Sequence, residues 1–329
     1  MFQRRQFLKT AGLAMIGAVV GVPADAPAQD APPRVKLGKS QAGFWRLKVG
    51  GTEVIALSDG TLPLPTEVLT GSPEHVATLM RASWAKSPVD LSVNAFLIVG
   101  DDRLMLVDAG TGTLLGPTLD KLEASLGAAG YKPEQITDIL VTHLHADHIG
   151  GLTADGKRVF PNAVAHVNRV EADYWLNEAN KQAAAAYHQH TFDMAKAKFG
   201  PYLEAGKASL FDGETALFPG IRSLPAPGHT PGHSFYVLES GGEKLVFWGD
   251  IVHIGEVQFP DPNVSIRFDS DPKAAAARRK RVLAQAASEG TLIAGAHIAF
   301  PGAGRLAKAG SGYRWIPMPY VNDAPSAKG

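Results

Sequence analysis

The most informative segment of this chain reads Thr142-His143-Leu144-His145-Ala146-Asp147-His148-Ile149-Gly150-Gly151. It continues the apolar run 138–142, which is typical of a short buried strand. Four side chains that can bind a metal ion fall within the six positions from 143 to 148. Because neighbouring side chains point in different directions once a strand ends, we expect His143 and His145 to face one ion and Asp147 and His148 to face a second. The Gly150-Gly151 pair is interpreted as the point where the backbone turns away sharply.

Three more candidate ligands each follow a strand-like run later in the chain. They are His229 in Pro227-Gly228-His229-Thr230-Pro231-Gly232-His233, Asp250 in Trp248-Gly249-Asp250, and His297 in Gly295-Ala296-His297. All of these side chains offer nitrogen or oxygen, which suits two divalent ions that share one carboxylate. We predict two divalent metal ions, most readily Zn²⁺, although manganese, iron or cobalt would accept the same donors. The predicted ligands are His143, His145 and His229 for the first ion, Asp147, His148 and His297 for the second, and Asp250 as the bridge.

The composition of the chain excludes several kinds of site, and its overall charge favours none of several classes of partner. The chain has 329 residues, of which 45% are hydrophobic, as expected for a globular protein with a substantial core. It has no cysteine, which excludes disulfides, thiolate ligands and a cysteine nucleophile. Its 32 lysines and arginines equal its 32 aspartates and glutamates, so no overall field favours nucleic acid or an anionic membrane. The one basic run, Arg278-Arg279-Lys280-Arg281, is interpreted as a solvated helix face.

Two similar halves are indicated by the alternation of β-rich runs with Gly and Asp turns. Each half contains strands followed by a helical pattern, which predicts an α/β fold built as a four-layer αββα sandwich. The expected strands span residues 44–49, 53–58, 93–99, 103–108, 138–142, 163–167, 222–226, 234–238, 244–248 and 291–294. The expected helices span 114–129 and 272–288, and the Ala-rich stretch 171–199 is biased toward helix.

The H-x-H-x-D-H motif at 143–148, with the later His229, Asp250 and His297, resembles the metal-binding pattern of the metallo-β-lactamase superfamily. The resemblance covers essentially the whole chain after residue 28, and it implies the same four-layer fold and a dinuclear metal hydrolase. In such a hydrolase, Asp147 and Asp250 belong to the catalytic site together with a hydroxide that bridges the two ions. A mononuclear-iron sulfur oxygenase that uses the same histidines is an alternative of another class, and a non-catalytic metal-binding protein is a third.

Other polar residues have supporting roles in this prediction. Asp108 ends a strand beside the motif, and we expect it to accept a hydrogen bond from a ligand histidine and fix its tautomer. The same role is extended to Asp59 in Ser58-Asp59-Gly60. His233 is either such a supporting residue or a structural turn residue. The remaining histidines are assigned to the core or the surface: His75, His166, His188 and His190.

Within the superfamily the chain resembles methyl parathion hydrolase and the related dihydrocoumarin hydrolases. The stretches that carry this resemblance are 56–60, 116–119, 128–131, 171–176, 257–259 and 300–302. The resemblance implies a homodimer and an apolar pocket for aromatic leaving groups. The pocket positions are Leu69, Leu115, Trp175, Phe192, His253, Ile266 and Phe268, for each of which plain core packing is the alternative.

Several of these pocket positions depart from the phosphotriesterase pattern, and Phe268 and His253 make a bulkier rim. This rim suits a flat aromatic lactone better than a tetrahedral dialkyl phosphate. We therefore predict a lactonase or arylesterase that acts on dihydrocoumarin-like substrates, with weak organophosphate triesterase activity. The alternatives are a methyl-parathion-type organophosphate hydrolase and an acyl-homoserine lactonase.

The N-terminus resembles a twin-arginine export signal. It contains Arg4-Arg5-Gln6-Phe7-Leu8-Lys9, an apolar run over 11–22 and the small-residue sequence Ala26-Pro27-Ala28. An apolar run of 12 residues is too short for a membrane anchor, which needs about 20. We therefore predict a signal over residues 1–28, one hydrolase domain over 29–329 and a periplasmic or secreted protein.

Overall fold

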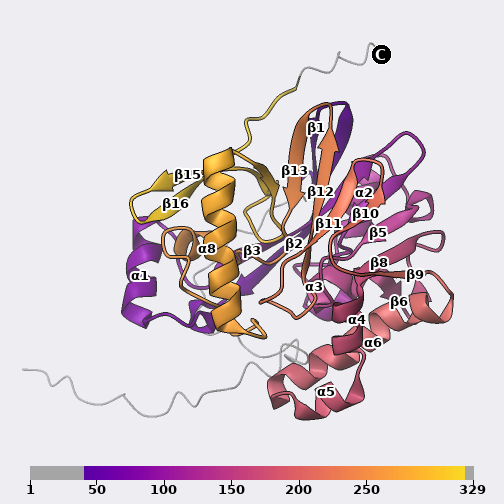
Figure 1. Cartoon of the computed structure of the whole chain (residues 1–329), viewed down its shortest axis with the longest axis horizontal. Coiled ribbons are helices and arrows are strands. Elements are labelled where there is room, and N and C mark those ends of the chain that lie inside the picture. The colour runs from indigo at the N-terminus through magenta and orange to yellow at the C-terminus, as the bar shows by residue number, and fades with distance from the viewer. Residues whose placement is uncertain (1–40, 323–329) are drawn as a thin grey trace, which may run out of the picture.

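Two seven-stranded sheets form the centre of the molecule (Figure 1). The computed structural model describes residues 41–322, so the predicted export signal lies outside the described residues. Sheet one has the order β1 (Phe44–Val49), β2 (Thr52–Leu64), β3 (Val89–Val99), β4 (Leu104–Val107), β5 (Asp138–Leu140), β8 (Val164–Asn168) and β9 (Ala208–Phe211). Sheet two has the order β10 (Thr215–Phe218), β11 (Ile221–Pro225), β12 (Ser234–Ser240), β13 (Glu243–Phe247), β14 (Leu292–Ala294), β15 (Ala303–Ala309) and β16 (Gly312–Pro317). A small hairpin joins β6 (Thr153–Ala154) to β7 (Lys157–Arg158).

Helices cover the outer faces of both sheets, which confirms the predicted αββα sandwich. Sheet one is covered by α2 (Leu122–Ala128), α4 (Arg169–Trp175) and α6 (Ala186–Glu204), with the short α3 (Ala146–Ile149) and α5 (Glu178–Ala183) beside them. Sheet two is covered by α8 (Pro272–Glu289), which crosses in front of its strands in Figure 1. Two further helices, α1 (Pro73–Ala82) and α7 (Gly255–Gln258), pack near the far end of β2. Within residues 41–322, none of the helices combines the length and apolar character needed to cross a membrane.

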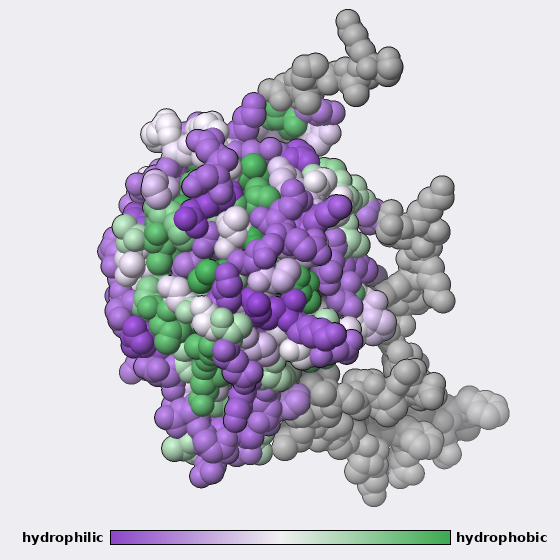
Figure 2. All heavy atoms as spheres, turned by 90° about the vertical axis from the view of Figure 1, so that its right-hand side faces the viewer, coloured by the Kyte–Doolittle hydropathy of each residue, from purple (hydrophilic) through white to green (hydrophobic). Residues whose placement is uncertain are grey.

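The largest cores lie between the two sheets and under the helices of sheet one. Side chains from both sheets, such as Phe96 and Phe247, interdigitate between them with ring centroids 5.5 Å apart. A second core joins the other face of sheet one to α2, α4 and α6 and contains Trp175 and Phe199. Burying each such large side chain contributes about 1.5–3 kcal/mol. On the face in Figure 2, hydrophilic residues cover most of the described surface and apolar residues lie among them in small groups.

Strand direction brings the predicted metal ligands to one edge of the molecule. In sheet one, β4, β5 and β8 are parallel, so the loops after them leave at the same end. In sheet two, β13 and β14 are parallel, and β11 runs in the same direction as β13 because both are antiparallel to β12. The segments that follow these strands carry the H-x-H-x-D-H motif, His229, Asp250 and His297. The loops with candidate ligands therefore come from both sheets.

The predicted helix over 114–129 is wrong in its first half, because α2 begins only at Leu122. A single 3₁₀ turn covers Gly112–Leu114, and Gly116 follows with a φ of 106°, outside the helical range. The helix starts where the carboxylate of Asp59 accepts the backbone N–H groups of Lys121 and Leu122, each at 2.9 Å. The helix-biased stretch 171–199 divides into α4, α5 and α6.

The prediction of a solvated basic face holds for only part of the run Arg278–Arg281. Lys280 and Arg281 are exposed, whereas Arg279 is 1% exposed and lies inside the protein. The buried positions of α8 are Ala275, Arg279, Leu283 and Ala286. This spacing places Arg279 on the apolar stripe of the helix, at the position where a helical period would place a core residue.

A buried ion-pair network joins β4, β5 and β8 away from the ligand loops. One oxygen of Asp138 lies 2.8 Å from Nε2 of His166, and the other accepts hydrogen bonds from Arg103 at 2.9 Å and from Thr137 at 2.8 Å. Burial by itself raises the pKa of Asp138, but the hydrogen bonds from His166, Thr137 and Arg103 outweigh it and lower the pKa below its usual value.

This network predicts acid sensitivity with a definite sign. Because the folded-state pKa of Asp138 is lowered, the unfolded chain binds more protons as the pH falls below about 4. The stabilisation from Asp138 is thus present above about pH 4 and is lost as the pH falls further. We expect Asp138→Asn to reduce the free energy of unfolding at pH 7 and to flatten its decline between about pH 5 and pH 3. Urea unfolding across this range measures both effects, and identical slopes for the two proteins would refute the assignment.

Candidate metal centre

The structure brings all seven predicted ligand residues together in two overlapping groups. The first contains His143, His145, His229 and Asp250, and the second contains Asp147, His148, His297 and Asp250. Within each group, one possible ligand atom from every residue lies within 4.8 Å of the others. Asp250 belongs to both groups, which is the position of the predicted bridge.

Asp250 lies at the middle of the cluster and is 3% exposed. Its Oδ1 lies 3.1 Å from Nε2 of His148 and 3.2 Å from Nε2 of His297. Its Oδ2 lies 3.2 Å from Nε2 of His229 and 3.6 Å from Nε2 of His143. One carboxylate thus faces imidazoles from both groups.

Three of the imidazoles are held in the same tautomer. Nδ1 of His148 lies 2.7 Å from Oδ2 of Asp108, and Nδ1 of His229 lies 2.9 Å from Oδ1 of Asp269. Nδ1 of His297 lies 2.9 Å from the carbonyl oxygen of Ser92. A carboxylate or a carbonyl only accepts hydrogen bonds, so each Nδ1 carries the proton and donates it. Once the imidazole is neutral, the lone pair of each Nε2 therefore points into the centre, as a metal ligand requires.

Several buried atoms of the cluster lack hydrogen-bond partners among the described residues. They are Nε2 of His143, Nε2 of His148 and Oδ1 of Asp250. Leaving a buried polar atom unsatisfied costs about 1–3 kcal/mol. Unsatisfied atoms of this kind, divided between two groups that share Asp250, are expected where cations complete the site, and nitrogen and carboxylate oxygen suit borderline divalent ions. The residues present therefore fit two divalent metal ions.

Carboxylates set the charge of the centre in the metal-free protein. Burial disfavours the cationic form of His297, but Asp250 and Asp147 outweigh it and raise its pKa to about 10. Asp250 and Asp269 likewise raise the pKa of His229 to about 9 against the effect of burial. Burial and the neighbouring imidazoles hold the pKa of His143 and His145 well below the usual value. Asp250, Asp147 and Asp108 also raise the pKa of His148 against the effect of burial, so metal binding must displace protons from three imidazoles and we expect metal affinity to fall with decreasing pH.

The two predicted supporting aspartates have different positions. Asp108 contacts His148 and also accepts hydrogen bonds from the backbone N–H of Thr142 at 2.8 Å and from its hydroxyl at 2.9 Å. Asp59 contacts neither group of candidate ligands, so the role extended to it is wrong. The strand bulge between Ser58 and Gly60 directs its carboxylate to the backbone N–H of Thr111 at 2.8 Å and to the start of α2.

The structure separates the two alternatives for His233. Its Nε2 accepts the backbone N–H of Asp250 at 3.1 Å, and its Nδ1 lies 3.2 Å from the carbonyl oxygen of Ala226. Burial and the nearby His229 lower the pKa of His233 to about 3, so this imidazole is neutral. His233 thus supports the backbone of Asp250 as well as the turn before His229.

Two buried carboxylates that support the centre were missed in the sequence. Oε1 of Glu171 accepts the backbone N–H of Leu144 at 2.9 Å, between the two histidines of the first group. Its Oε2 accepts the hydroxyl of Thr230 at 2.7 Å and the backbone N–H of Gly232 at 2.8 Å. Glu171 therefore ties the loop after β5 to the loop after β11. The second missed carboxylate is Asp269, which contacts His229.

The interpretation of Gly150 and Gly151 as a sharp turn is wrong. Gly150 has ordinary helical angles, with φ −58° and ψ −36°. The glycines are required because another loop approaches closely: a Cβ on Gly150 would lie 1.9 Å from the carbonyl oxygen of Thr111, and one on Gly151 would lie 2.1 Å from that of Ala109. Two backbone segments therefore interlock beside the second group.

This close approach predicts a strong effect of one methyl group. We expect Gly150→Ala to reduce the free energy of unfolding by at least about 2 kcal/mol, because backbone atoms must move to admit it. It should also weaken metal binding, since His148 lies two residues away. The control is Gly127→Ala near the end of α2, where a Cβ meets nothing within 4 Å and where alanine should gain at most about 0.5–1 kcal/mol. Chemical unfolding compares the two variants, and equal small effects would contradict the interlock.

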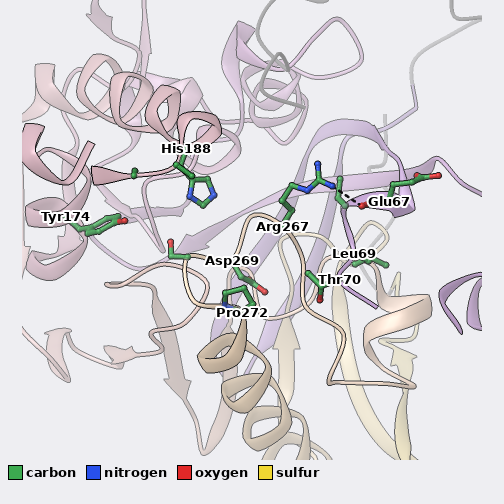
Figure 3. Close-up of a pocket in the computed structure, with 12 residues that line it drawn as sticks. Glu67, Leu69, Thr70, Tyr174, His188, Arg267, Asp269 and Pro272 are labelled. Atoms are coloured by element: carbon green, nitrogen blue, oxygen red, sulfur yellow. Dashed lines mark hydrogen bonds between the residues drawn. The ribbon is translucent and has the colours of Figure 1, made fainter. Parts of the chain in front are cut away.

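Two cavities adjoin the centre. The first has a volume of about 550 Å³ and is lined on one side by Tyr174 and on the other by Leu69 and Arg267 (Figure 3). Asp269, the partner of His229, forms part of its wall. The second, of about 310 Å³, reaches His253 and His297. Its other lining residues include the aromatic side chains of Phe259, Tyr313 and Trp315.

The predicted pocket residues lie in several environments. Leu69 lines the first cavity and His253 the second, where Nε2 of His253 lies 3.1 Å from Oδ2 of Asp250. Trp175 is buried with its ring 5.2 Å from that of His145, and Phe192 packs behind it at 4.6 Å. Both rings belong to the core between sheet one and its helices, and neither lines one of the two cavities, contrary to the prediction that they reach the pocket. Three other residues line neither cavity: Leu115 is half-buried after a 3₁₀ turn, Ile266 is fully buried, and Phe268 packs against the same core as Ile266.

The sequence was compared with models of known protein families. A family model described as the metallo-beta-lactamase superfamily matches residues 88–297, which include both groups of candidate ligands. The chain belongs to the metallo-beta-lactamase superfamily. The prediction of a metal-dependent hydrolase of this superfamily is thereby confirmed.

Two solved structures resemble the chain over nearly their whole length. The hydrolase AbOPH is 34% identical with a TM-score of 0.83, and the match covers 86% of this chain and 100% of that one. The dizinc quorum-quenching lactonase AidC is 28% identical with a TM-score of 0.77, and the match covers 85% of this chain and 99% of that one.

Curated relatives match over shorter stretches. An N-acyl homoserine lactonase of Bacillus cereus is 29% identical over 152 residues, which are 46% of this chain and 52% of that protein. A probable metallo-hydrolase of Mycobacterium tuberculosis is 27% identical over 201 residues, which are 55% of this chain and 63% of that protein. The chain thus spans about half to three-fifths of the length of these relatives.

Proposed function

We propose that the chain hydrolyses small aromatic lactones or aryl esters of the dihydrocoumarin type, at a centre that binds two zinc ions. The observation that carries the choice of substrate is the second cavity, which reaches His253 and His297 and is lined by Phe259, Tyr313 and Trp315 together with polar residues such as Glu256 and Arg314. The rings of Phe259 and Trp315 stack there with centroids 5.8 Å apart. Its volume of about 310 Å³ lies at the lower end of the range for small-molecule sites, about 300–1,000 Å³, and accommodates a planar bicyclic lactone. The sequence resemblance to the dihydrocoumarin hydrolases points to the same substrate class.

The protein's own residues prepare the centre for this reaction. When bound, two divalent ions supply an activated water and polarise the oxygen of an ester carbonyl. Asp250 faces both positions, while Asp108, Asp269 and the carbonyl of Ser92 hold three imidazoles with Nε2 directed inward. A phenolate leaving group needs little protonation, so the reaction does not depend on a strong general acid. The proposal of zinc is supported by the donor set and by the similar lactonase AidC, which is described as dizinc.

Acyl-homoserine lactone hydrolysis is the second candidate. It is favoured by AidC and by several curated relatives named as N-acyl homoserine lactonases. The first cavity, about 550 Å³ and partly polar, offers room for an acyl chain beside Asp269. Phosphotriester cleavage of the methyl parathion type remains a proposed weak side activity.

Steady-state assays of metal-quantified enzyme test these alternatives. The substrates are dihydrocoumarin, p-nitrophenyl esters, an acyl-homoserine lactone and methyl parathion, each repeated with His145→Ala. We expect kcat/KM for the aromatic lactone to exceed that for methyl parathion by orders of magnitude and the variant to be inactive. If methyl parathion or the acyl-homoserine lactone is best, the corresponding assignment replaces ours. One iron per chain without hydrolysis would favour the sulfur oxygenase class.

Two cavity variants refine the same test. Trp315→Leu alters the aromatic cavity, and Tyr174→Leu alters the first cavity. We expect Trp315→Leu to reduce kcat/KM for dihydrocoumarin more than for the acyl-homoserine lactone. The reverse ranking, with the larger loss in Tyr174→Leu, would move the aromatic substrate to the first cavity.

The localisation and the oligomeric state complete the proposal. Export through the segment 1–28 to the periplasm or beyond is tested by cell fractionation with Arg4→Lys and Arg5→Lys together, which should retain the protein in the cytoplasm. A homodimer, without nucleic acid or a stable membrane anchor, is tested by light scattering on the purified protein. A monomeric mass would reject the homodimer.

A further inference from the structure

The buried arginine of α8 is a part of the protein to which the proposed mechanism gives no role. Nε of Arg279 donates a hydrogen bond to the carbonyl oxygen of Ile251 at 2.7 Å, directly after Asp250. Its Nη1 donates to the carbonyl oxygens of Val264 at 2.7 Å and Pro262 at 3.2 Å. The side chain is 1% exposed, so these contacts are made away from solvent. One guanidinium thus holds two separate loops at fixed positions.

The second of these loops leads to Asp269, which also faces the same guanidinium. Nη2 of Arg279 lies 3.6 Å from Oδ2 of Asp269, and that oxygen accepts the backbone N–H of Ile266 at 3.2 Å. The other oxygen, Oδ1, accepts the hydrogen bond from Nδ1 of His229. The backbone N–H of Ser270, next in the chain, donates to the carbonyl oxygen of His229 at 2.7 Å. Asp269 therefore holds the imidazole of His229 while the following residue holds its backbone.

We propose that Arg279 and Asp269 are positioning residues that set the affinity of the first metal position, formed by His143, His145, His229 and Asp250. This inference rests on the part of the proposed function that assigns metal binding to the centre. Arg279 fixes the backbone after Asp250, and through Asp269 it fixes His229, so two of the four residues in that group depend on it. At the second metal position only Asp250 depends on Arg279. His148 is held there by Asp108, and His297 is held by the carbonyl oxygen of Ser92.

The choice of arginine follows from the geometry. The planar guanidinium directs several N–H groups in fixed directions, which allows three carbonyl oxygens and a carboxylate to be contacted at once. A lysine ammonium at the same place carries the charge but offers a single point of attachment. A buried ion pair adds little net stability, so the contribution of this pair is expected in the geometry of the site.

The test measures metal affinity directly, without relying on catalysis. The metal-free wild-type chain, Asp269→Asn and Arg279→Lys are titrated with Co²⁺, with its visible absorption recorded, and with Zn²⁺ in competition with a chromophoric chelator. We expect both variants to bind one of the two ions about 10–100-fold more weakly, the range typical of lost partners of ligand histidines. The other ion should be weakened much less, because its position takes only Asp250 from these loops. Because Asp269 and Arg279 act in one chain of contacts, the double variant should lose less than the sum of the two single losses.

Matched controls come from the same chain. Asp138→Asn changes a buried aspartate that contacts a histidine outside the ligand groups, and Arg281→Lys changes an exposed arginine of the same helix. Both should leave both metal affinities unchanged. If Arg279→Lys does not fold, Asp269→Asn alone decides the question.

The proposal is overturned if Asp269→Asn binds both ions like the wild type, or weakens both equally. It is also overturned if the cobalt spectrum is unchanged while only the melting temperature falls, since that is the result of a purely structural role. A wild-type chain that binds two ions but hydrolyses none of the lactones or esters would reject the proposed function and leave this inference standing.

Discussion

Asp250→Ala is expected to lose bound metal and to reduce kcat/KM for the best lactone substrate by at least about a thousandfold, or about 4 kcal/mol at 1.36 kcal/mol per factor of ten. The reason is the position of Asp250 in both groups of candidate ligands, with each of its oxygens facing imidazoles. Removing this carboxylate takes one donor from each metal position and leaves several buried imidazoles facing one another. Metal analysis after desalting, together with steady-state kinetics, measures both effects.

Asp250→Asn keeps the size of the side chain and removes its charge. We expect it to lose nearly as much bound metal and activity as Asp250→Ala. Asp193→Ala, which removes an exposed aspartate paired with Lys181 on the surface, serves as the control and should be unaffected. Retention of two ions and of activity within about tenfold in Asp250→Ala would mean that this residue does not join the two metal positions.

Glu171→Ala is expected to have the largest effect on stability. Its carboxylate is fully buried and accepts hydrogen bonds from Leu144, Thr230 and Gly232. Each donor that loses its acceptor in the interior costs about 1–3 kcal/mol, so we expect a loss of about 3–5 kcal/mol, near the top of the range for single substitutions. The first metal position should weaken as well, because Leu144 lies between His143 and His145. Chemical unfolding of the metal-free protein and a Zn²⁺ titration measure the two losses separately.

The exposed residue Glu178 on the neighbouring α5 provides the comparison. Glu178→Ala should change stability by no more than about 0.5 kcal/mol. Equal effects of the two substitutions would show that Glu171 does not link the loops after β5 and β11.

The sequence indicates the candidate ligands because their signal is local. Four of them occupy neighbouring positions, and each of the others follows a strand-like run that the structure contains: β11 before His229, β13 before Asp250 and β14 before His297. The layers of the fold follow for a similar reason, since β-rich runs and one amphipathic helix are visible in short windows.

The supporting residues are harder to predict because their partners are distant. Asp269 and His229 are 40 positions apart, and Glu171 and Thr230 are 59 apart. Nothing in the residues next to Glu171 or Asp269 indicates a partner in another loop. Arg279 did carry a signal, since a helical period through Ala275 and Leu283 passes through it, but the adjacent basic residues concealed this pattern. The late start of α2 was also visible, in Gly116 and Pro117.

The two sheets contribute jointly to each proposed metal position. The loop after β5 in sheet one supplies His143 and His145 to the first and Asp147 and His148 to the second, while sheet two supplies His229, Asp250 and His297. Each bound ion would therefore connect sheet one to sheet two through its ligands. Binding and packing of the sheets are then thermodynamically linked, so metal at a hundred times its dissociation constant would add about 2.7 kcal/mol to the stability of the entire domain. Removal of the metal should therefore lower the melting temperature of both sheets together rather than that of one sheet alone.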